Sequence, residues 1–276
     1  MNGSAVIRRP GSIAEAVAAM GECPQFTVCA GGTALMPGLN RHPESVPAGW
    51  IFLGGIEELR GWRRTSSGGW RLGALVTLEQ VASLGDDLSL LAHAARGAGS
   101  WQLRNAATLG GSLVAAWATS DVITALCCLE TQVEIVSATG VRHAALEEFI
   151  VGSGHTVLGA GELLSAVLVG PTAGRHSYTR VGARAANSPL LCALAVSADP
   201  RLETVRVAVA DGSHVARRAP AAERLLFAEA DPAAFAAAAQ SVAAPGDDAL
   251  ASAAYRRHAI GVLARRAHRA LRGGAR

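Results

Sequence analysis

The stretch from Ala98 to Asp121 constrains the fold more than any other part of the chain. A polar, basic turn region is expected first, then the turn Thr108-Leu-Gly-Gly-Ser112, then an apolar run closed by Ser120-Asp121. The two glycines place residues with free backbone dihedral angles between two short hydroxyl side chains. Such a turn lets backbone N–H groups converge on an anion while the hydroxyls donate from either side. We therefore expect this turn to bind a phosphate group.

A second glycine turn has a similar setting. Phe26-Thr-Val-Cys-Ala30 is predicted to be a short buried strand, and it leads directly into Gly31-Gly-Thr-Ala-Leu35. A strand followed by Gly-Gly-Thr brings bare backbone against a phosphate. A Gly-Gly pair alone carries little information, because the chain has five of them among its 31 glycines, starting at Gly31, Gly54, Gly68, Gly110 and Gly273. Neither turn is a G-x-G-x-x-G or Walker sequence, and the chain contains no lysine.

Composition limits the class of protein. The 276 residues are 50% hydrophobic and 17% charged, which is typical of a globular protein. The net charge of +3 is small, and the arginines are spread along the chain until Arg256–Arg276, so nucleic-acid binding is not predicted. No apolar run is long enough to span a membrane, and the N-terminus lacks a secretion signal, so we expect a cytoplasmic protein.

Cysteine and histidine spacing predicts no metal site. The five cysteines are odd in number and contain no C-x-x-C spacing, which disfavours a disulfide framework, a zinc site or an iron–sulfur cluster. The eight histidines include no i,i+3 or i,i+4 pair.

The order of elements predicts an α+β fold in which residues 171–176, rich in Pro, Thr, Gly and charge, separate two domains. Residues 147–154 are expected to be a loop. Further strands are expected at 50–53, 70–74, 132–137, 161–169, 178–181, 190–196 and 205–209. Helices are expected at 12–20 and from 77, because Ser12 with Glu15 and Thr77 with Gln80 have capping-box spacing. Further helices are expected at 88–95, 122–129, 220–228, 232–241 and 251–271. The last has Tyr255, Ala259, Val262, Leu263 and Ala267 on one face and the arginines largely opposite.

Three features have a simple structural interpretation. Asp121 is either the N-cap of the helix that starts at Val122 or a carboxylate that accepts hydrogen bonds from sugar hydroxyls, and the cap is the simpler interpretation. Arg104 and Arg180 are most simply solvated surface residues, and Cys127-Cys128 is most simply part of the core.

The run Gln102-Leu-Arg-Asn-Ala-Ala-Thr-Leu-Gly-Gly-Ser-Leu113 closely resembles the second flavin motif of the molybdopterin dehydrogenase FAD-binding family, which includes the medium subunits of carbon monoxide dehydrogenases and the flavin domains of xanthine dehydrogenases. Ala30–Leu35 resembles the family's first flavin turn. Other segments resemble the family in the same order along nearly the whole chain, namely 9–16, 149–152, 161–167, 178–184, Arg218 with Glu223, and 252–266.

The resemblance implies a PCMH-type FAD-binding domain of two α+β subdomains at residues 1–171, followed by a small α+β domain at 175–272 like that of carbon monoxide dehydrogenase flavoproteins. It implies FAD as cofactor. The first turn would wrap the diphosphate, the second turn would hold diphosphate and ribityl from the other side, and a carboxylate would bind a sugar hydroxyl. A leucine would lie near the isoalloxazine ring, and an arginine would replace the family's lysine. The residues implied are Ala30, Gly31, Gly32, Thr33, Ala34, Leu35, Thr108, Gly110, Gly111, Ser112, Asp121, Leu163 and Arg180.

The chain departs from the family at three polar positions. Many relatives carry His-Ala-Asp-Pro where this chain has Ala115-Ala-Trp-Ala118, and Ala34 stands where Asp, Ser or Glu is frequent. Trp117 either shields or stacks near the flavin or packs in the core, and the sequence favours neither. These losses predict altered substrate access, altered electron exit or weaker flavin binding.

Three functions remain open from the sequence. The first is a flavin electron-transfer subunit that works with molybdopterin and iron–sulfur chains and reduces a quinone, NAD or oxygen, with no side chain required as a catalytic acid or base. The second is a stand-alone FAD-dependent oxidoreductase that oxidises a small molecule. The third is a non-redox scaffold or sensor on the same fold.

Overall fold

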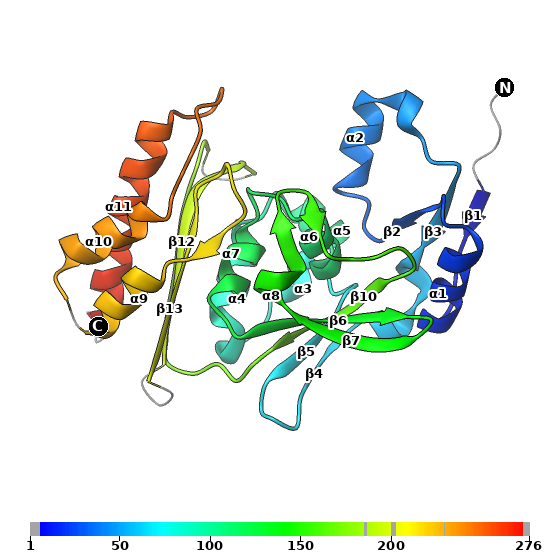
Figure 1. The fold of residues 1–276 in the computed structure, drawn as a ribbon, viewed down its shortest axis with the longest axis horizontal. Helices are drawn as coiled ribbons and strands as arrows, with labels where there is room; N and C mark the ends of the chain where they lie inside the picture. The colour runs from blue at the N-terminus through cyan, green and yellow to red at the C-terminus, as the bar shows by residue number, and fades with distance from the viewer. Residues whose placement is uncertain (1–5, 185–186, 200–202, 229, 273–276) are drawn as a thin grey trace.

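The computed structural model describes residues 6–184, 187–199, 203–228 and 230–272, which form a mixed α+β fold. Figure 1 shows a small N-terminal sheet at one end, a group of C-terminal helices at the opposite end, and a layer of short helices with an antiparallel sheet between them.

The N-terminal segment forms a small parallel sheet. Its elements are β1 (Val6–Arg8), α1 (Ile13–Glu22), β2 (Thr27–Cys29), α2 (Leu35–Arg41) and β3 (Gly49–Phe52), with 3-10 turns η1 (Pro43–Ser45), η2 (Leu53–Gly55) and η3 (Glu57–Leu59). The strand order is β1–β3–β2, and both pairings are parallel. α1 begins where the sequence predicts, because the Ser12 hydroxyl accepts a hydrogen bond from the Glu15 N–H at 3.1 Å.

A five-stranded antiparallel sheet follows, and all but one of the short helices of this part are inserted between its second and third strands in the chain. The strands, in sheet order, are β4 (Trp62–Arg64), β5 (Trp70–Gly73), β10 (Leu163–Val169), β6 (Thr131–Ser137) and β7 (Gly140–Ala145). The helices are α3 (Leu78–Ala82), η4 (Asp86–Leu88), α4 (Ser89–Gly97), α5 (Trp101–Ala106), α6 (Leu109–Ala115), α7 (Asp121–Cys127) and α8 (Leu146–Phe149), and the hairpin β8 (Ile150–Gly152) and β9 (His155–Thr156) completes this part.

The C-terminal part is an antiparallel meander covered by helices. Its elements are β11 (Arg175–Gly182), β12 (Leu190–Asp199), β13 (Thr204–Ala210), β14 (Arg217–Arg218), α9 (Pro220–Phe227), α10 (Pro232–Ser241) and α11 (Ala253–Arg272). In Figure 1 these three helices lie together on one side of β12 and β13.

Strand β12 is buried on both faces. Cys192, Leu194 and Val196 belong to the core beneath α9, α10 and α11. The alternate residues Ala193 and Ala195 belong to the other core, which they share with residues of α4 and α7. Small alanines on that face let helix α7 approach the sheet closely. The expected boundary at residues 171–176 coincides with the connection between β10 and β11, but hydrophobic packing continues across it, so the division into domains stays a prediction.

Two local expectations were wrong. The polar segment before Thr108 forms helix α5, whose Ser100 cap accepts from the Leu103 N–H at 3.2 Å. Residues 147–154 contain α8 and β8 instead of a loop. By contrast, the capping box predicted at Thr77 is confirmed, because Thr77 and Gln80 bond each other's backbone N–H groups.

Helix α11 has the expected amphipathic pattern at Ala259, Leu263 and Ala267, which are buried, but differs from it at Tyr255 and Arg256. Arg256 is only 1% exposed, and its guanidinium lies 2.5 Å from Asp248 Oδ2. Tyr255, expected on the apolar face, is 48% exposed. The buried stripe includes Arg256, Ala259, Ile260 and Leu263, so the arginine lies on the buried side and depends on loop acceptors.

The double burial of β12 predicts a large effect of cavity formation there. We expect Leu194→Ala to lower the free energy of unfolding by about 2–5 kcal/mol, because the leucine is fully buried and its neighbours are helices that relax only partly. The control Val141→Ala, at a residue 59% exposed on the edge strand β7, should change it by less than about 0.5 kcal/mol. Urea denaturation of both variants tests this, and equal losses would contradict the packing described.

Candidate functional site

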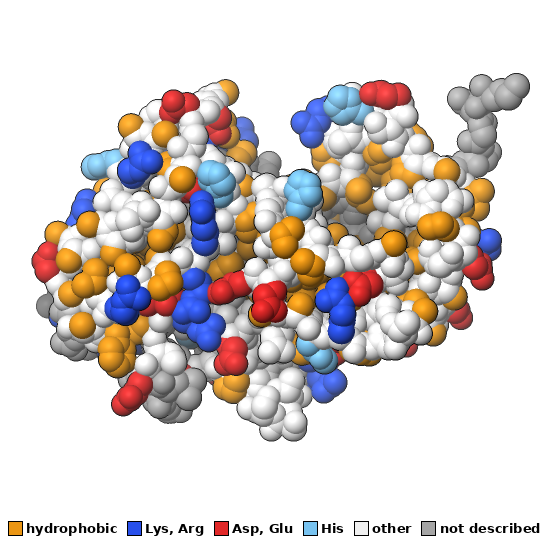
Figure 2. Space-filling model, viewed as in Figure 1, with side chains coloured by type: hydrophobic (Ala, Val, Ile, Leu, Met, Phe, Trp, Pro, Cys, Tyr) orange, Lys and Arg blue, Asp and Glu red, His pale blue; other side chains and the backbone are white. Residues whose placement is uncertain are grey.

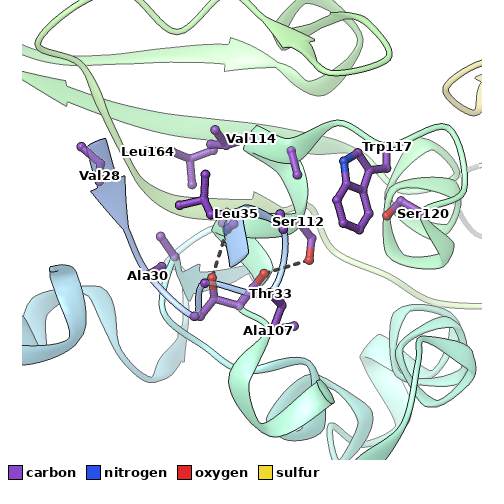
Figure 3. Close-up of a pocket in the computed structure, with 18 of the residues that line it drawn as sticks. Val28, Ala30, Thr33, Leu35, Ala107, Ser112, Val114, Trp117, Ser120 and Leu164 are labelled. Carbon is purple, nitrogen blue, oxygen red and sulfur yellow. Dashed lines mark hydrogen bonds between the residues drawn. The ribbon is translucent and has the colours of Figure 1, made fainter. Parts of the chain in front are cut away.

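A cavity of about 770 Å³ lies where the N-terminal unit, the short helices and the C-terminal part meet. Its lining comes from residues within 30–35, 74–78, 98–103, 107–122, 158–164 and 187–190 and, at an apolar end, from around Met20, Phe26, Val28 and Leu53. In Figure 3, Val28, Ala30 and Leu35 lie at one end of the view, Trp117 and Ser120 at the other, and Ser112 between them. The volume falls in the usual range for small-molecule and cofactor sites.

The turn between β2 and α2 packs directly on helix α5. A Cβ on Gly31 would overlap the carbonyl oxygen of Ala106, so a side chain there has no space. Gly32 has a φ of +70°, in the left-handed region that favours glycine. Both glycines are therefore explained by backbone requirements of this junction.

The same turn presents unused donors to the cavity. Thr33, Ala34 and Leu35 line it, and their backbone N–H groups donate to no other described residue. The first bond of this helix from an N–H to a carbonyl runs from Met36 to Gly32 at 2.9 Å. A row of free N–H groups at the start of a helix is an arrangement that binds anions.

The Thr108–Ser112 turn differs from the expectation. Its backbone donors are already used, because the Leu109 N–H bonds Val76, the Gly110 N–H bonds Ala74 at 2.9 Å, and the Gly111 N–H bonds the Thr108 hydroxyl at 3.1 Å. The Ser112 hydroxyl donates to the Thr108 carbonyl at 2.9 Å. A Cβ on Gly110 would lie 2.7 Å from that of Ala74, so this glycine allows close packing. The turn lines the cavity as a helix start that is capped by the protein itself.

Asp121 lies in the cavity wall but is not the helix cap. Ser120 is the cap of α7, since its hydroxyl accepts from the Ile123 N–H at 3.3 Å, and Asp121 is the first helical residue. The Asp121 Oδ1 atom accepts from the Tyr178 hydroxyl at 2.6 Å and lies 2.9 Å from Arg180 Nε. Burial raises the pKa of the Asp121 carboxyl, and the Arg180 charge and the Tyr178 hydrogen bond oppose this in part.

Arg180 lies behind the wall instead of in it. Its side chain is 17% exposed, and its two terminal nitrogens donate to the carbonyls of Gly97 and Ser188 at 3.0 Å each. The simple expectation of a solvated surface arginine was wrong, as it was for Arg104, whose Nε donates to Glu79 at 2.7 Å. That Arg180 replaces a cation at a flavin stays a prediction, because the residue does not line the cavity.

The opposite wall carries Leu163 and Glu162. Leu163 is 4% exposed at the start of β10. Glu162 bonds Arg142 in a bidentate pair at 2.6 Å and accepts from the Gly159 N–H at 2.8 Å. These hydrogen bonds, that of Arg142 first, lower the pKa of Glu162 to about 2. The carboxylate is therefore held in place with its charge balanced by an arginine.

The segment that departs from the family pattern forms a corner of the cavity. Ala116 ends helix α6 in the left-handed region with φ 45°, and its carbonyl accepts from the Gly154 N–H at 3.0 Å. Trp117 follows, lines the cavity and is 50% exposed. The alternative that Trp117 packs in the core is therefore excluded, and stacking on a ligand stays a prediction.

The structure thus brings twelve of the thirteen expected site residues to one cavity, all except Arg180. Sequence reasoning missed the apolar end and Ser188–Leu190, which follow from tertiary contact between distant segments. In the described part of the chain, no group of three or more metal-binding side chains is found, and no helix combines the length and hydropathy required to cross a membrane.

More than half of the chain matches a known protein family. The family described as "FAD binding domain in molybdopterin dehydrogenase" matches residues 3–172. The nicotine 6-hydroxylase medium subunit of Paenarthrobacter nicotinovorans is 30% identical over 79% of this chain and 78% of that protein. The putative xanthine dehydrogenase FAD-binding subunit of Escherichia coli K12 is 28% identical over 61% of this chain and 59% of that protein, so the chain matches less than two thirds of this relative.

A solved structure is similar over the whole length. A carbon monoxide dehydrogenase chain from Hydrogenophaga pseudoflava, in an enzyme that lacks the Mo-pyranopterin moiety of its cofactor, has a TM-score of 0.90 and 26% identity, and the match covers 99% of both chains. The quinoline 2-oxidoreductase of Pseudomonas putida 86 has a similar fold, with a TM-score of 0.89 at 23% identity.

The junction at Gly31 predicts opposite effects for two alanine substitutions in the same region. Gly31→Ala should lower the free energy of unfolding by about 3 kcal/mol or more, because the new Cβ meets backbone that cannot move freely. Gly38→Ala, in the middle of α2 with open space around it, should be neutral or stabilise by about 0.5–1 kcal/mol. Urea unfolding midpoints of the two variants measure the difference, and a tolerated Gly31→Ala would refute the close contact.

The Glu162–Arg142 pair predicts a pH effect. The folded pKa of Glu162, about 2, is below its ordinary value of 4.5, so its stabilisation is complete above pH 4.5 and is lost as the pH falls towards 2. Glu162→Gln should therefore melt at a lower temperature than the parent at pH 6, with the gap closing by pH 2–3. Thermal melts across this range test it, and a gap independent of pH would show that the carboxylate charge is not the cause.

Proposed function

The chain belongs to the FAD-binding family of the molybdopterin dehydrogenases, and from this premise we propose that it is the flavin subunit of a dehydrogenase of that type, with FAD bound in the cavity. The observation that carries the proposal is the row of free N–H groups at Thr33, Ala34 and Leu35, which opens into a cavity large enough for a dinucleotide.

The residues present fit a cofactor with a diphosphate. Such a group needs donors, and the β2–α2 turn offers backbone N–H groups that the protein itself does not use. Hydroxyls of Thr33 and Thr119 also line the cavity. The same cavity has an apolar end, around Met20, Phe26 and Val28, suited to a base, and a wall with Leu163, suited to a flat ring.

The expected site residues in the cavity then have proposed roles. The turn from Ala30 to Leu35 holds the diphosphate, Asp121 accepts from a sugar hydroxyl, and Leu163 contacts the isoalloxazine ring. The turn from Thr108 to Ser112 shapes the wall beside the diphosphate and ribityl chain through packing. FAD, when bound, supplies the redox chemistry, while the apolar walls keep water from the ring.

We propose that the partners are separate iron–sulfur and molybdopterin chains, from which electrons pass through this subunit to a quinone, NAD or oxygen. The names of similar proteins support this, because they describe medium chains and FAD-binding subunits, including the carbon monoxide dehydrogenase medium chain of Afipia carboxidovorans at 26% identity over 96% of both proteins.

A second candidate is a stand-alone flavoprotein that oxidises a small molecule. The corner at Ala115–Ala118 motivates it, because a half-exposed indole at Trp117 faces the cavity where many relatives carry polar residues. Purification of the native complex separates the two: recovery with molybdenum and iron supports the subunit, and recovery of a yellow protein alone that is reduced by a small molecule supports the second candidate.

The proposal of bound flavin predicts an absorption spectrum with flavin bands for the purified protein and release of FAD on denaturation. If FAD is absent, added FAD at about 100 times its Kd should stabilise the folded protein by about 2.7 kcal/mol. A colourless protein that neither quenches the fluorescence of added FAD nor gains stability from it would refute the proposal.

A matched pair of substitutions locates the diphosphate. Thr33→Asp places a carboxylate beside the free N–H groups, where it competes with and repels a diphosphate, whereas Thr33→Asn has the same shape without the charge. We expect the Kd for FAD, from quenching of flavin fluorescence, to rise at least tenfold more in the Asp variant, about 1.4 kcal/mol. Equal affinities in the two folded variants would exclude this turn as the diphosphate site.

A further inference from the structure

The charges around the cavity follow one arrangement. Among the described residues that line it, none is an arginine or a histidine, and the acidic ones are Asp121 and Glu162. Each of these carboxylates has an arginine behind it, Arg180 for Asp121 and Arg142 for Glu162. The cavity therefore has two charge-balanced pairs and no cation of its own in the described wall.

The two pairs differ in their exposure to solvent. The side chains of Asp121 and Arg180 are 5% and 17% exposed, whereas those of Glu162 and Arg142 are 18% and 43% exposed. Charges near solvent are screened, and buried charges act over longer distances because the surrounding medium is less polarisable. A change of charge in the Asp121–Arg180 pair therefore alters the electrostatic potential in the cavity far more than a change of charge in the Glu162–Arg142 pair.

Arg180 is fixed independently of Asp121. Its terminal nitrogens donate to the Gly97 and Ser188 carbonyls, while the 2.9 Å contact between Nε and Asp121 Oδ1 is a charge contact in which the N–H is not aligned with the oxygen. Loss of the Asp121 charge would therefore leave the guanidinium in place, behind the wall and uncompensated. Tyr178 contributes a hydrogen bond to the carboxylate but no charge.

We propose that Asp121 cancels the charge of Arg180 and thereby holds down the reduction potential of the flavin in this cavity. The inference rests on the proposed function. A positive charge near a flavin favours its electron-rich reduced form, so the charge near the ring is one means by which a protein sets this potential. Asp121 acts here as a positioning residue for charge, in addition to any contact it makes with a sugar hydroxyl.

The test is the reduction potential of bound FAD, measured by equilibration with reference dyes. Asp121→Asn keeps an acceptor for Tyr178 and removes the negative charge, so the equilibrium constant for reduction should rise at least tenfold, about 30 mV for this two-electron couple. Arg180→Gln should not raise it. The double variant Asp121→Asn/Arg180→Gln should return to within about threefold of the parent, because the charges are removed together.

Two controls separate charge from structure. Tyr178→Phe removes the hydrogen bond without a charge and should change the constant by less than about threefold. Glu162→Gln unbalances the exposed pair and should have a similarly small effect, because solvent screens Arg142. If Asp121→Asn does not fold, the uncharged double variant and Arg180→Gln still decide the matter, since a potential that rises in either one overturns the inference.

The outcomes also separate this inference from the proposed function. A parent chain that binds no FAD would overturn both. A parent and a folded Asp121→Asn variant that bind FAD with the same potential would overturn the charge cancellation alone. A shift of the same sign and size in Asp121→Asn, Arg180→Gln and the double variant would point to general loosening of the wall and would also overturn it.

Discussion

The contact between the backbone of Gly31 and the carbonyl of Ala106 underlies the rest of the site. It joins the small parallel sheet to the layer of short helices, two units that otherwise have separate strands. Because no side chain stands between them, the β2–α2 turn faces the wall formed by α6 with its N–H groups free. The cavity thus forms where these units meet. Its free N–H donors belong to the N-terminal unit, in the turn between β2 and α2.

The two glycine turns have similar sequences but differ in whether their backbone N–H groups are free. The N–H groups of the Thr108–Ser112 turn donate to the carbonyls of Val76 and Ala74 and to the Thr108 hydroxyl, so this turn forms part of the wall. The other keeps its donors for the cavity. The described cavity wall also carries no cation, and its two carboxylates are paired with arginines that lie outside the wall.

Local signals in the sequence predicted local structure well. The cap at Ser12, the capping box at Thr77 and most strands are where hydroxyl spacing and apolar runs indicate. Two local expectations failed, at α5 and α8, but the failures at buried arginines arose where partners are distant in the chain. Arg180 and Arg256 are typical surface residues by composition, and their burial depends on distant partners such as Asp121 and the carbonyl of Asp211, which no local pattern reveals. The resemblance to a family supplied the expected site residues, but which N–H groups are free depends on tertiary hydrogen bonds.

The double burial of strand β12 has a consequence for how the protein could be divided. The family match ends at residue 172, yet Ser188–Leu190 line the cavity, and Tyr178 and Arg180 hold Asp121 from the neighbouring strand β11. A fragment cut at that boundary would expose the apolar side of α7 and leave a carboxylate without its partners. The cavity wall and the C-terminal sheet therefore depend on each other structurally, although the family match covers only residues 3–172.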